Sequence, residues 1–121
     1  MNALACEILT YIESDAPDEE TFNRLALDVF AYQYAENDPY RRLCIATGVD
    51  PGSITHWTQI PAVPAIAYKR LELSCVPPAE AAAVFFSSGT TGAATSRHYF
   101  SGDSLALYEA SLRRGYDLAL E

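Results

Sequence analysis

Basic residues are scarce in this chain. Eight lysines and arginines stand against sixteen aspartates and glutamates, so the formal charge is −8 over 121 residues. Nucleic acids and anionic membrane surfaces bind cationic faces of proteins, and the composition therefore argues against both as main partners. Even the adjacent pair Arg41 and Arg42 has too few basic neighbours to form a nucleic-acid patch.

Long apolar runs are missing as well. No run approaches the roughly 20 residues that cross a bilayer, so no membrane span is expected. The N-terminal segment has no basic cluster and reaches Glu7 almost at once, which is not the pattern of a secretory signal peptide. We therefore expect a soluble, cytoplasmic protein.

Cysteine occurs three times, at the widely separated positions Cys6, Cys44 and Cys75. No CxxC motif or Cys/His spacing indicates a zinc site. An odd number of isolated cysteines is typical of free thiols in a reducing compartment. We expect each of the three to be a buried apolar thiol.

The residues that are abundant predict a globular domain. Half of the chain is apolar and one fifth is charged, which excludes general disorder. Residues 4–13 are expected to form a short helix. Asp18 is expected to cap a second helix, whose apolar stripe over residues 22–33 ends on the polar Gln33. The length suits a single region spanning residues 1–121.

Two more helices are expected further along the chain. Asp38 as N-cap and Pro39 at the first helical position predict a short third helix, which Gly48 ends in the left-handed conformation. Asp103 is expected to cap the last helix. Apolar residues lie on several sides of that last helix, so we expect more protein to pack against it.

The segment between these helices has the pattern of extended chain. Pro61 and Pro64 exclude a helix across them, and residues 65–73 fit either a strand or a short helix. The apolar run 82–86 predicts a strand buried on both faces. Residues 97–100 are interpreted as the returning strand of a hairpin.

The residues between those two strands have an unusual composition. Residues 87–92 read SSGTTG and carry four hydroxyls and two glycines. Consecutive backbone N–H groups in such a loop can converge on an anion, and glycine allows close approach. A Walker A motif is absent, because GxxxxGK[ST] does not occur and no lysine follows Lys69. From composition alone, a phosphate-binding loop and a plain polar hairpin tip remain equally open.

The motif and its surroundings carry a family resemblance. SSGTTG resembles the phosphate loop of adenylate-forming enzymes, whose usual form is SSGTTGxPK. With the upstream segments FNRLALDVFAYQYAENDPYRRLC and HWTQIPAVPAIAYKRLEL, residues of about 20–118 resemble the N-terminal part of acyl-protein synthetases of the bacterial luminescence (LuxE) type. The chain is therefore interpreted as the N-terminal portion of an AMP-binding domain. It is expected to supply the phosphate-binding loop and to be incomplete and inactive as an isolated chain of 121 residues.

This resemblance implies a fold, a reaction and a set of ligands. The fold is α/β, with N-terminal helices packed on the first strands of a larger mixed sheet and the phosphate loop at a strand end. The reaction is ATP- and Mg²⁺-dependent activation of a carboxylic acid, such as a fatty acid, followed by transfer to a protein thiol. The partners are ATP, the acyl substrate, and either the remaining part of the synthetase or an acyl-accepting protein. The implied phosphate-binding residues are Ser87, Ser88, Gly89, Thr90, Thr91 and Gly92.

The sequence also departs from the family pattern. The proline and lysine expected after Gly92 are replaced by Ala94 and Thr95, and Arg97 is hypothesised to supply the missing cation. His98 is either near the reacting carboxylate or a strand histidine satisfied by its neighbours. Lys69 is either a substrate contact or a solvated lysine.

Other functions remain open at this stage. The closest alternative is a fragment of a phenylacetate-type acyl-CoA ligase, which has a similar loop. A second is a non-catalytic remnant or partner-binding domain, and a third is a plain structural domain. The resemblance also implies that the acyl-accepting cysteine of the family lies near its C-terminus, so the three cysteines of this chain are not assigned that role.

Overall fold

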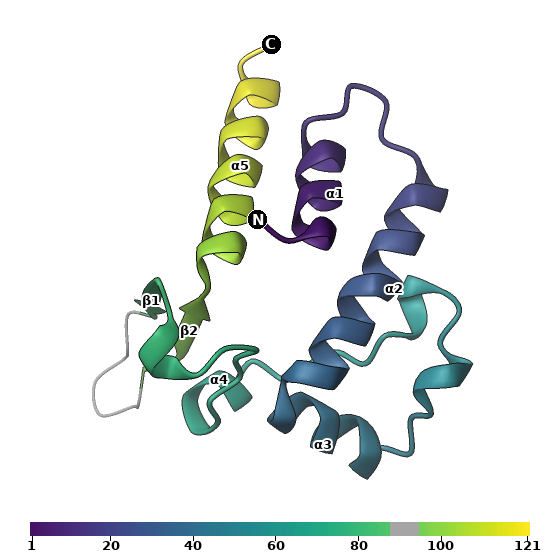
Figure 1. Cartoon of the computed structure of the whole chain (residues 1–121), viewed down its shortest axis with the longest axis vertical. Coiled ribbons are helices and arrows are strands. Elements are labelled where there is room, and N and C mark those ends of the chain that lie inside the picture. The colour runs from purple at the N-terminus through teal and green to yellow at the C-terminus, as the bar shows by residue number, and fades with distance from the viewer. Residues whose placement is uncertain (88–94) are drawn as a thin grey trace.

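The computed structural model describes residues 1–87 and 95–121. It is rich in helix and contains one small antiparallel sheet, which is compatible with the α/β class (Figure 1). The α-helices are α1 (Ala3–Ile12), α2 (Glu19–Glu36), α3 (Asp38–Ala46), α4 (Ala67–Arg70) and α5 (Gly102–Ala119). Strands β1 (Ala83–Phe86) and β2 (Arg97–Phe100) form the sheet, and 3₁₀ turns cover Pro51–Ser53, Trp57–Gln59 and Pro78–Glu80.

Side-chain caps set the helix boundaries, and two of them differ from the sequence-based expectation. Asp18 caps α2 as expected, and its hydrogen bonds to Thr21 lower the pKa of the carboxyl. Asn37, not Asp38, caps α3, because its side chain accepts from the Tyr40 N–H at 3.2 Å and leaves Asp38 in the first turn. Ser101, not Asp103, caps α5. The Gly48 prediction is confirmed, with φ at +75°.

The first and last helices of the described chain pack side by side, and α1 lies between α5 and α2 (Figure 1). Two polar contacts join the segments at opposite ends of the pair. The Asn2 N–H donates to the Asp103 carboxylate at 3.0 Å. Asp103, which was expected to cap α5, is thus engaged with the N-terminal segment instead. Arg114 forms an ion pair with Asp15 at 3.2 Å. Segments about a hundred residues apart in sequence therefore share one layer.

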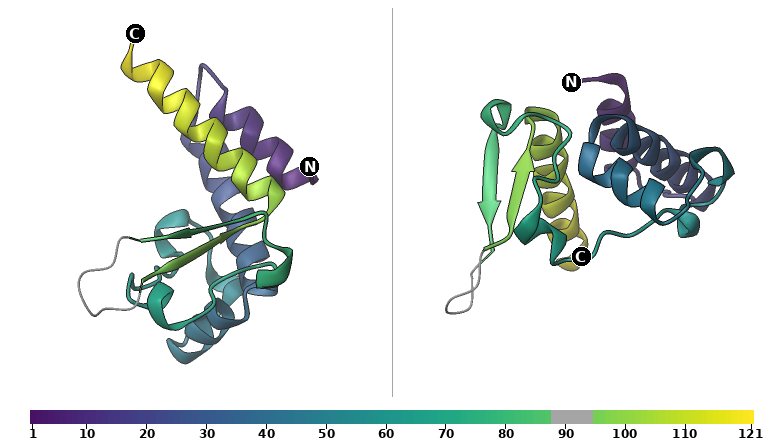
Figure 2. Two further views of the ribbon diagram at one scale, coloured as in Figure 1. Left: turned by 90° about the vertical axis from the view of Figure 1, so that its left-hand side faces the viewer. Right: turned by 90° about the horizontal axis from the view of Figure 1, so that it is seen from below.

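The hairpin stands beside the start of α5 (Figure 2). The register of its two strands pairs Ala83 with Phe100 and Phe86 with Arg97. The expectation that the first strand is buried on both faces is wrong, because Phe85 and Phe86 are 40% and 63% exposed. Within the described residues, β1 has one neighbouring strand, and the helix α5 contacts the hairpin through aromatic packing of Phe85 and Phe100 on Tyr108.

The tightest packing lies elsewhere, between α2 and α3. Phe30, Tyr40 and Cys44 form a buried cluster, and Cys44 is completely inaccessible. The Tyr40 hydroxyl donates to the Pro61 carbonyl at 2.8 Å, which ties the extended segment of residues 60–64 to this core. Burial raises the pKa of Tyr40, so the hydroxyl keeps the proton that it donates. Half-buried Val63 and Ile60 pack against the same cluster.

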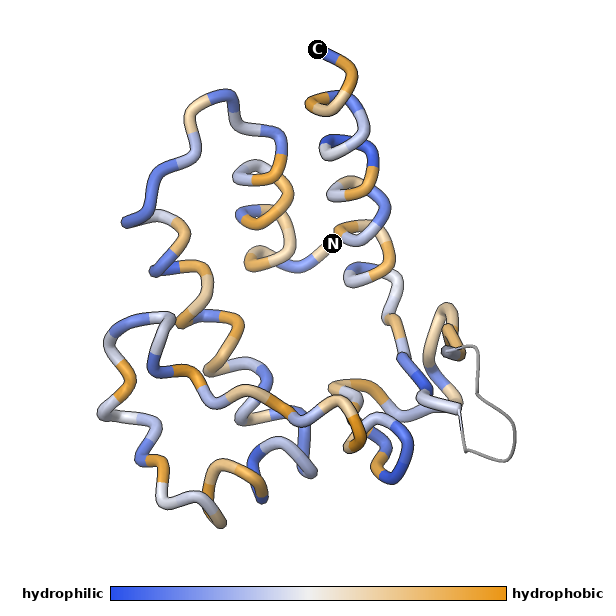
Figure 3. Tube along the Cα trace, turned by 180° about the vertical axis from the view of Figure 1, so that it is seen from behind, coloured by the Kyte–Doolittle hydropathy of each residue, from blue (hydrophilic) through white to orange (hydrophobic). Residues whose placement is uncertain are grey.

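Helix α5 leaves much of its apolar surface open. Figure 3 shows apolar residues recurring along its turns, and Tyr108, Leu112, Tyr116 and Leu118 are 42–66% exposed. The additional protein expected against this helix stays a prediction. Among the described residues, none of the helices combines the length and the apolar character that crossing a bilayer requires.

Candidate functional site

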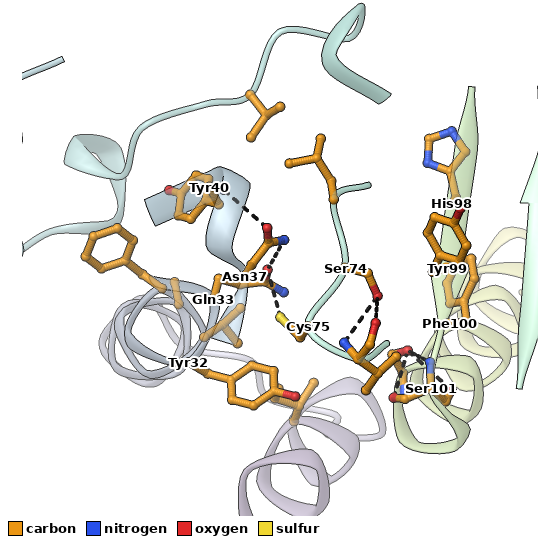
Figure 4. A pocket seen from close by; sticks show the side chains of 18 of the residues that line it. Tyr32, Gln33, Asn37, Tyr40, Ser74, Cys75, His98, Tyr99, Phe100 and Ser101 are labelled. Atoms are coloured by element: carbon orange, nitrogen blue, oxygen red, sulfur yellow. Dashed lines mark hydrogen bonds between the residues drawn. The ribbon is translucent and has the colours of Figure 1, made fainter. Parts of the chain in front are cut away.

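A groove of about 780 Å³ opens between the helical half of the molecule and the hairpin. Helix α2 forms one wall, strand β2 another, and the chain between residues 60 and 76 crosses between them (Figure 4). Its lining is mainly apolar and aromatic, with contributions from Ile8, Tyr11, Phe22, Leu25, Val29, Phe30, Ile60, Val63, Tyr68, Leu73, Val76, Tyr99 and Phe100. A concave, apolar site with few polar groups is the usual form of a small-molecule pocket.

One row of polar side chains crosses the floor of the groove (Figure 4). The Gln33 side-chain oxygen accepts from the Asn37 amide at 3.2 Å and from the Cys75 thiol at 3.1 Å. Asn37 is 6% exposed and also caps α3 through its own oxygen. The Gln33 oxygen, both polar atoms of the Asn37 side chain and the Cys75 thiol are therefore used within the protein. In the sequence, Gln33 stands out as the polar residue at the end of the apolar stripe of α2. The sequence does not indicate that Asn37 and Cys75 are its partners.

The thiols of the chain differ in their surroundings. Burial, together with the negative charge of Glu36, raises the pKa of the half-buried Cys75 to about 11. Cys44 is fully buried, as expected, whereas Cys6 is exposed on α1 and contradicts the expectation. The short helix α1 is covered by neighbours on part of its circumference, so a position outside that part stays in solvent.

The base of the hairpin is closed by two serines. The Ser87 N–H donates to the Ser96 carbonyl at 3.1 Å, and the Ser96 N–H donates to Ser87 Oγ at 2.9 Å. Ser96 is 8% exposed. Sequence reasoning did not single out Ser96, because its role depends on pairing across the hairpin. The structure thus describes the start of the SSGTTG segment at Ser87, where the chain leaves β1.

The other predicted residues of that segment, Ser88, Gly89, Thr90, Thr91 and Gly92, lie outside the described residues. Arg97 is described, at the start of β2 and paired with Phe86. It is half-buried and does not line the groove. The hypothesis that Arg97 supplies a cation to phosphate stays a prediction.

His98 follows Arg97 and does line the groove. Its ring stacks on Tyr68 of α4, with centroids 4.7 Å apart and an interplanar angle of 29°. Its Nε2 lies 3.1 Å from Ser96 Oγ. One histidine therefore connects the wall of the groove to the base of the hairpin, and its ring is held on two sides.

The remaining residues singled out in the sequence lie apart from this arrangement. Lys69 is exposed on α4, next to Tyr68, and does not line the groove. His56 caps the 3₁₀ turn Trp57–Gln59 through its ring nitrogen and packs near Trp57, a structural role. In the part of the chain that the structure describes, no three His, Cys, Asp or Glu side chains lie together as metal ligands would.

Comparison with known proteins matches the chain to a family. The family model for the acyl-protein synthetase LuxE matches residues 5–99. No curated protein and no solved structure matches the chain. The matched range begins within α1 and ends within β2. It contains the groove walls contributed by α2 and by residues 60–76, the strand β1, and β2 up to Tyr99.

Proposed function

Because the chain belongs to the LuxE acyl-protein synthetase family, we propose that it takes part in the ATP-dependent activation of a carboxylic acid and the transfer of the acyl group to a protein thiol. In the first step a carboxylate oxygen bonds to the α-phosphorus of ATP, and the bond to the bridging oxygen breaks, which releases pyrophosphate. In the second step a thiolate attacks the carbonyl carbon of the acyl-adenylate, and AMP leaves.

The observation that carries this proposal is the apolar groove. Its volume of about 780 Å³ and its aliphatic and aromatic walls suit the hydrocarbon part of an acyl substrate. Burying each methylene of such a chain contributes about 0.8 kcal/mol. The Gln33 oxygen accepts from the Asn37 amide, and most of the other lining residues are apolar, so apolar surface is the main attraction.

The proposed phosphate site is the SSGTTG segment, residues 87–92. Its support is the residue composition and the location of its first member. Ser87 is fixed to Ser96 by two hydrogen bonds, and Ser96 is in turn bonded to the groove residue His98. Backbone N–H groups and hydroxyls in this segment would bind the phosphate oxygens and stabilise the charge that develops on pyrophosphate.

Neither Mg²⁺ nor the acyl-accepting thiol is assigned to a residue. The described residues contain no cluster of acidic side chains suited to a metal ion. The raised pKa of Cys75 and the complete burial of Cys44 are unfavourable for a thiolate that must be acylated.

The experiment that tests the proposal is trapping of the activated acid. The chain is incubated with Mg-ATP, dodecanoate and hydroxylamine, and acyl hydroxamate and pyrophosphate are measured. Both products in equal amounts from the wild type, and neither from a variant with Gly89→Ala and Gly92→Ala, would show that the chain itself activates the acid. Calorimetric titration with Mg-ATP, which that variant should no longer bind, separates the binding role of the loop from turnover.

The alternatives predict different results. A phenylacetate-type ligase forms acyl-CoA when CoA is added and prefers an aryl acid. A chain that binds neither Mg-ATP nor dodecanoate would overturn the proposal that it contributes either substrate site. Binding of both ligands without hydroxamate would overturn activation by this chain while leaving its binding sites in place.

A further inference from the structure

We propose that His98 binds the carboxylate of the acid substrate and makes the groove selective for acids over neutral chains of the same length. The inference deepens the proposed function, and it rests on the groove being the acyl site. It concerns the end of the substrate that must meet ATP, whereas the groove volume concerns only its hydrocarbon part.

The charge of the lining is the first argument. Among the described residues that line the groove, none is Asp, Glu, Lys or Arg, and His98 is the one side chain there that can carry a positive charge. A carboxylate that enters an apolar groove without a partner loses its hydration at a large cost in free energy. A charge-assisted hydrogen bond to an imidazole offsets that cost.

The place of His98 is the second argument. It lies on β2 opposite Phe85, two residues after Ser96, which is hydrogen-bonded to the first residue of the SSGTTG segment. The carboxylate that attacks ATP must reach both the acyl groove and the phosphates. Of the groove-lining residues in the described chain, His98 is the nearest in sequence to that segment.

The third argument is how the ring is held. The stack on Tyr68 fixes its plane, and Ser96 Oγ engages Nε2 at 3.1 Å. When the serine hydroxyl donates to Nε2, the proton of a neutral ring is on Nδ1, which is then the donor available to a ligand. No described residue forms a hydrogen bond with Nδ1. The His98 ring has a fixed orientation, and its Nδ1 is available to a ligand, so it is suited to orienting a carboxylate.

Arg97 is the competing cation, and its position separates it from this role. It lies at the start of β2, paired with Phe86. It does not line the groove, whereas the next three residues, His98, Tyr99 and Phe100, do.

The test compares two ligands that differ at one end. Dodecanoate and dodecanol are titrated against the full chain, with displacement of a fluorescent fatty-acid probe as the readout. We expect the wild type to bind dodecanoate about tenfold more tightly than dodecanol. His98→Ala should abolish this preference by weakening the acid alone, and the alcohol should bind within about twofold of wild type. His98→Gln, which keeps a neutral donor, should retain part of the preference.

Two controls make the outcome decisive. His56→Ala removes a histidine outside the groove and should leave the preference intact. Ala26→Trp fills the groove from α2 and should weaken both ligands. If His98→Ala and His98→Gln both fold, as judged by circular dichroism, and keep the wild-type preference, the inference is overturned. The proposal that the groove binds the acyl chain is then unaffected. If one variant fails to fold, the other decides.

A different result would overturn the premise as well. If the wild type binds neither ligand, or if Ala26→Trp leaves both affinities unchanged, the groove is not the acyl site. The inference about His98 then falls together with that part of the proposed function.

Discussion

Ser87 and Ser96 close the base of the hairpin by bonding twice, once through both backbones and once through the Ser87 hydroxyl. The backbone bond is of the kind that joins antiparallel strands. Here a side chain completes the pair, so the SSGTTG segment starts from a residue with little freedom. The same serine pair is linked to His98, which places one polar connection between hairpin and groove.

Removing the hydroxyl of Ser87 should therefore destabilise the hairpin. In Ser87→Ala the N–H of Ser96, a residue 8% exposed, loses its partner. We expect a loss of about 1–2 kcal/mol in the free energy of unfolding, measured by urea denaturation, and faster hydrogen exchange at the Ser96 amide. Ser111→Ala, at an exposed position inside α5, is the matched control: it should leave exchange at Ser96 unchanged and should not destabilise, because alanine favours a helix interior. Unchanged exchange at Ser96 would contradict this role of the hydroxyl.

Asn37 should be among the most sensitive polar positions. It caps α3 and donates to Gln33 from a buried position. Asn37→Ala removes both bonds, and we expect a cost of about 2 kcal/mol in thermal or urea unfolding. Asn37→Ser keeps a capping oxygen and loses the donor to Gln33 without burying a charge, so its cost should be smaller. Equal costs for the two variants would mean that the bond to Gln33 contributes all of the effect.

Two glycines should respond to alanine in opposite directions. Gly48 has φ at +75°, where a Cβ is strained, and Gly48→Ala is expected to cost about 1 kcal/mol. Gly115 lies in α5, and a Cβ there meets no atom within 4 Å. Gly115→Ala should stabilise by about 0.5–1 kcal/mol, because alanine favours a helix interior. We expect the melting temperature of Gly48→Ala to lie below that of the wild type and that of Gly115→Ala to lie above it.

The thiols should react in a fixed order. With a pKa of about 11, Cys75 is a thiolate in roughly one molecule in a thousand at pH 8. Exposed Cys6 should react with Ellman's reagent first, Cys75 much more slowly, and buried Cys44 only on unfolding, as read by mass mapping. Fast labelling of Cys75 in the folded protein would contradict the assigned burial.

The raised pKa of Cys75 also affects the stability of the fold at high pH. The folded-state pKa of Cys75 lies above its ordinary value of 9.0, so the folded state holds this proton more tightly. The stabilisation is present below pH 9 and is lost as the pH rises through 11. Cys75→Ala should unfold with a flatter pH dependence in that window, whereas Cys6→Ala should follow the wild type.

Much of the fold follows from local patterns in the sequence. Asp18 caps its helix and Gly48 ends another, since each depends on chemistry within a few residues. The caps of α3 and α5 were displaced by one or two positions because Asn37 and Ser101 compete for the same role as Asp38 and Asp103. The sequence of residues 65–73 fits either a strand or a short helix, and the structure forms a single helical turn there, α4.

What local patterns did not reveal is pairing across distance. The apolar run before the motif predicted a strand but not its exposure, because burial depends on what packs against Phe85 and Phe86. Ser96, Cys75 and Tyr68 are ordinary residues in sequence, and they become part of the site through partners that lie on other elements. The motif itself was recognised by resemblance, and most of it lies outside the described residues.

The contact between α1 and α5 also constrains the order in which the chain acquires its structure. A ribosome releases α1 first, and the surface that covers it, near Asp103 and Arg114, follows about a hundred residues later. Contacts of such high sequence separation slow folding, because a long loop must close before they form. During synthesis the side of α1 that packs on α5 therefore stays uncovered after α2 has emerged, and in this interval the nascent chain is exposed to aggregation or to capture by a chaperone.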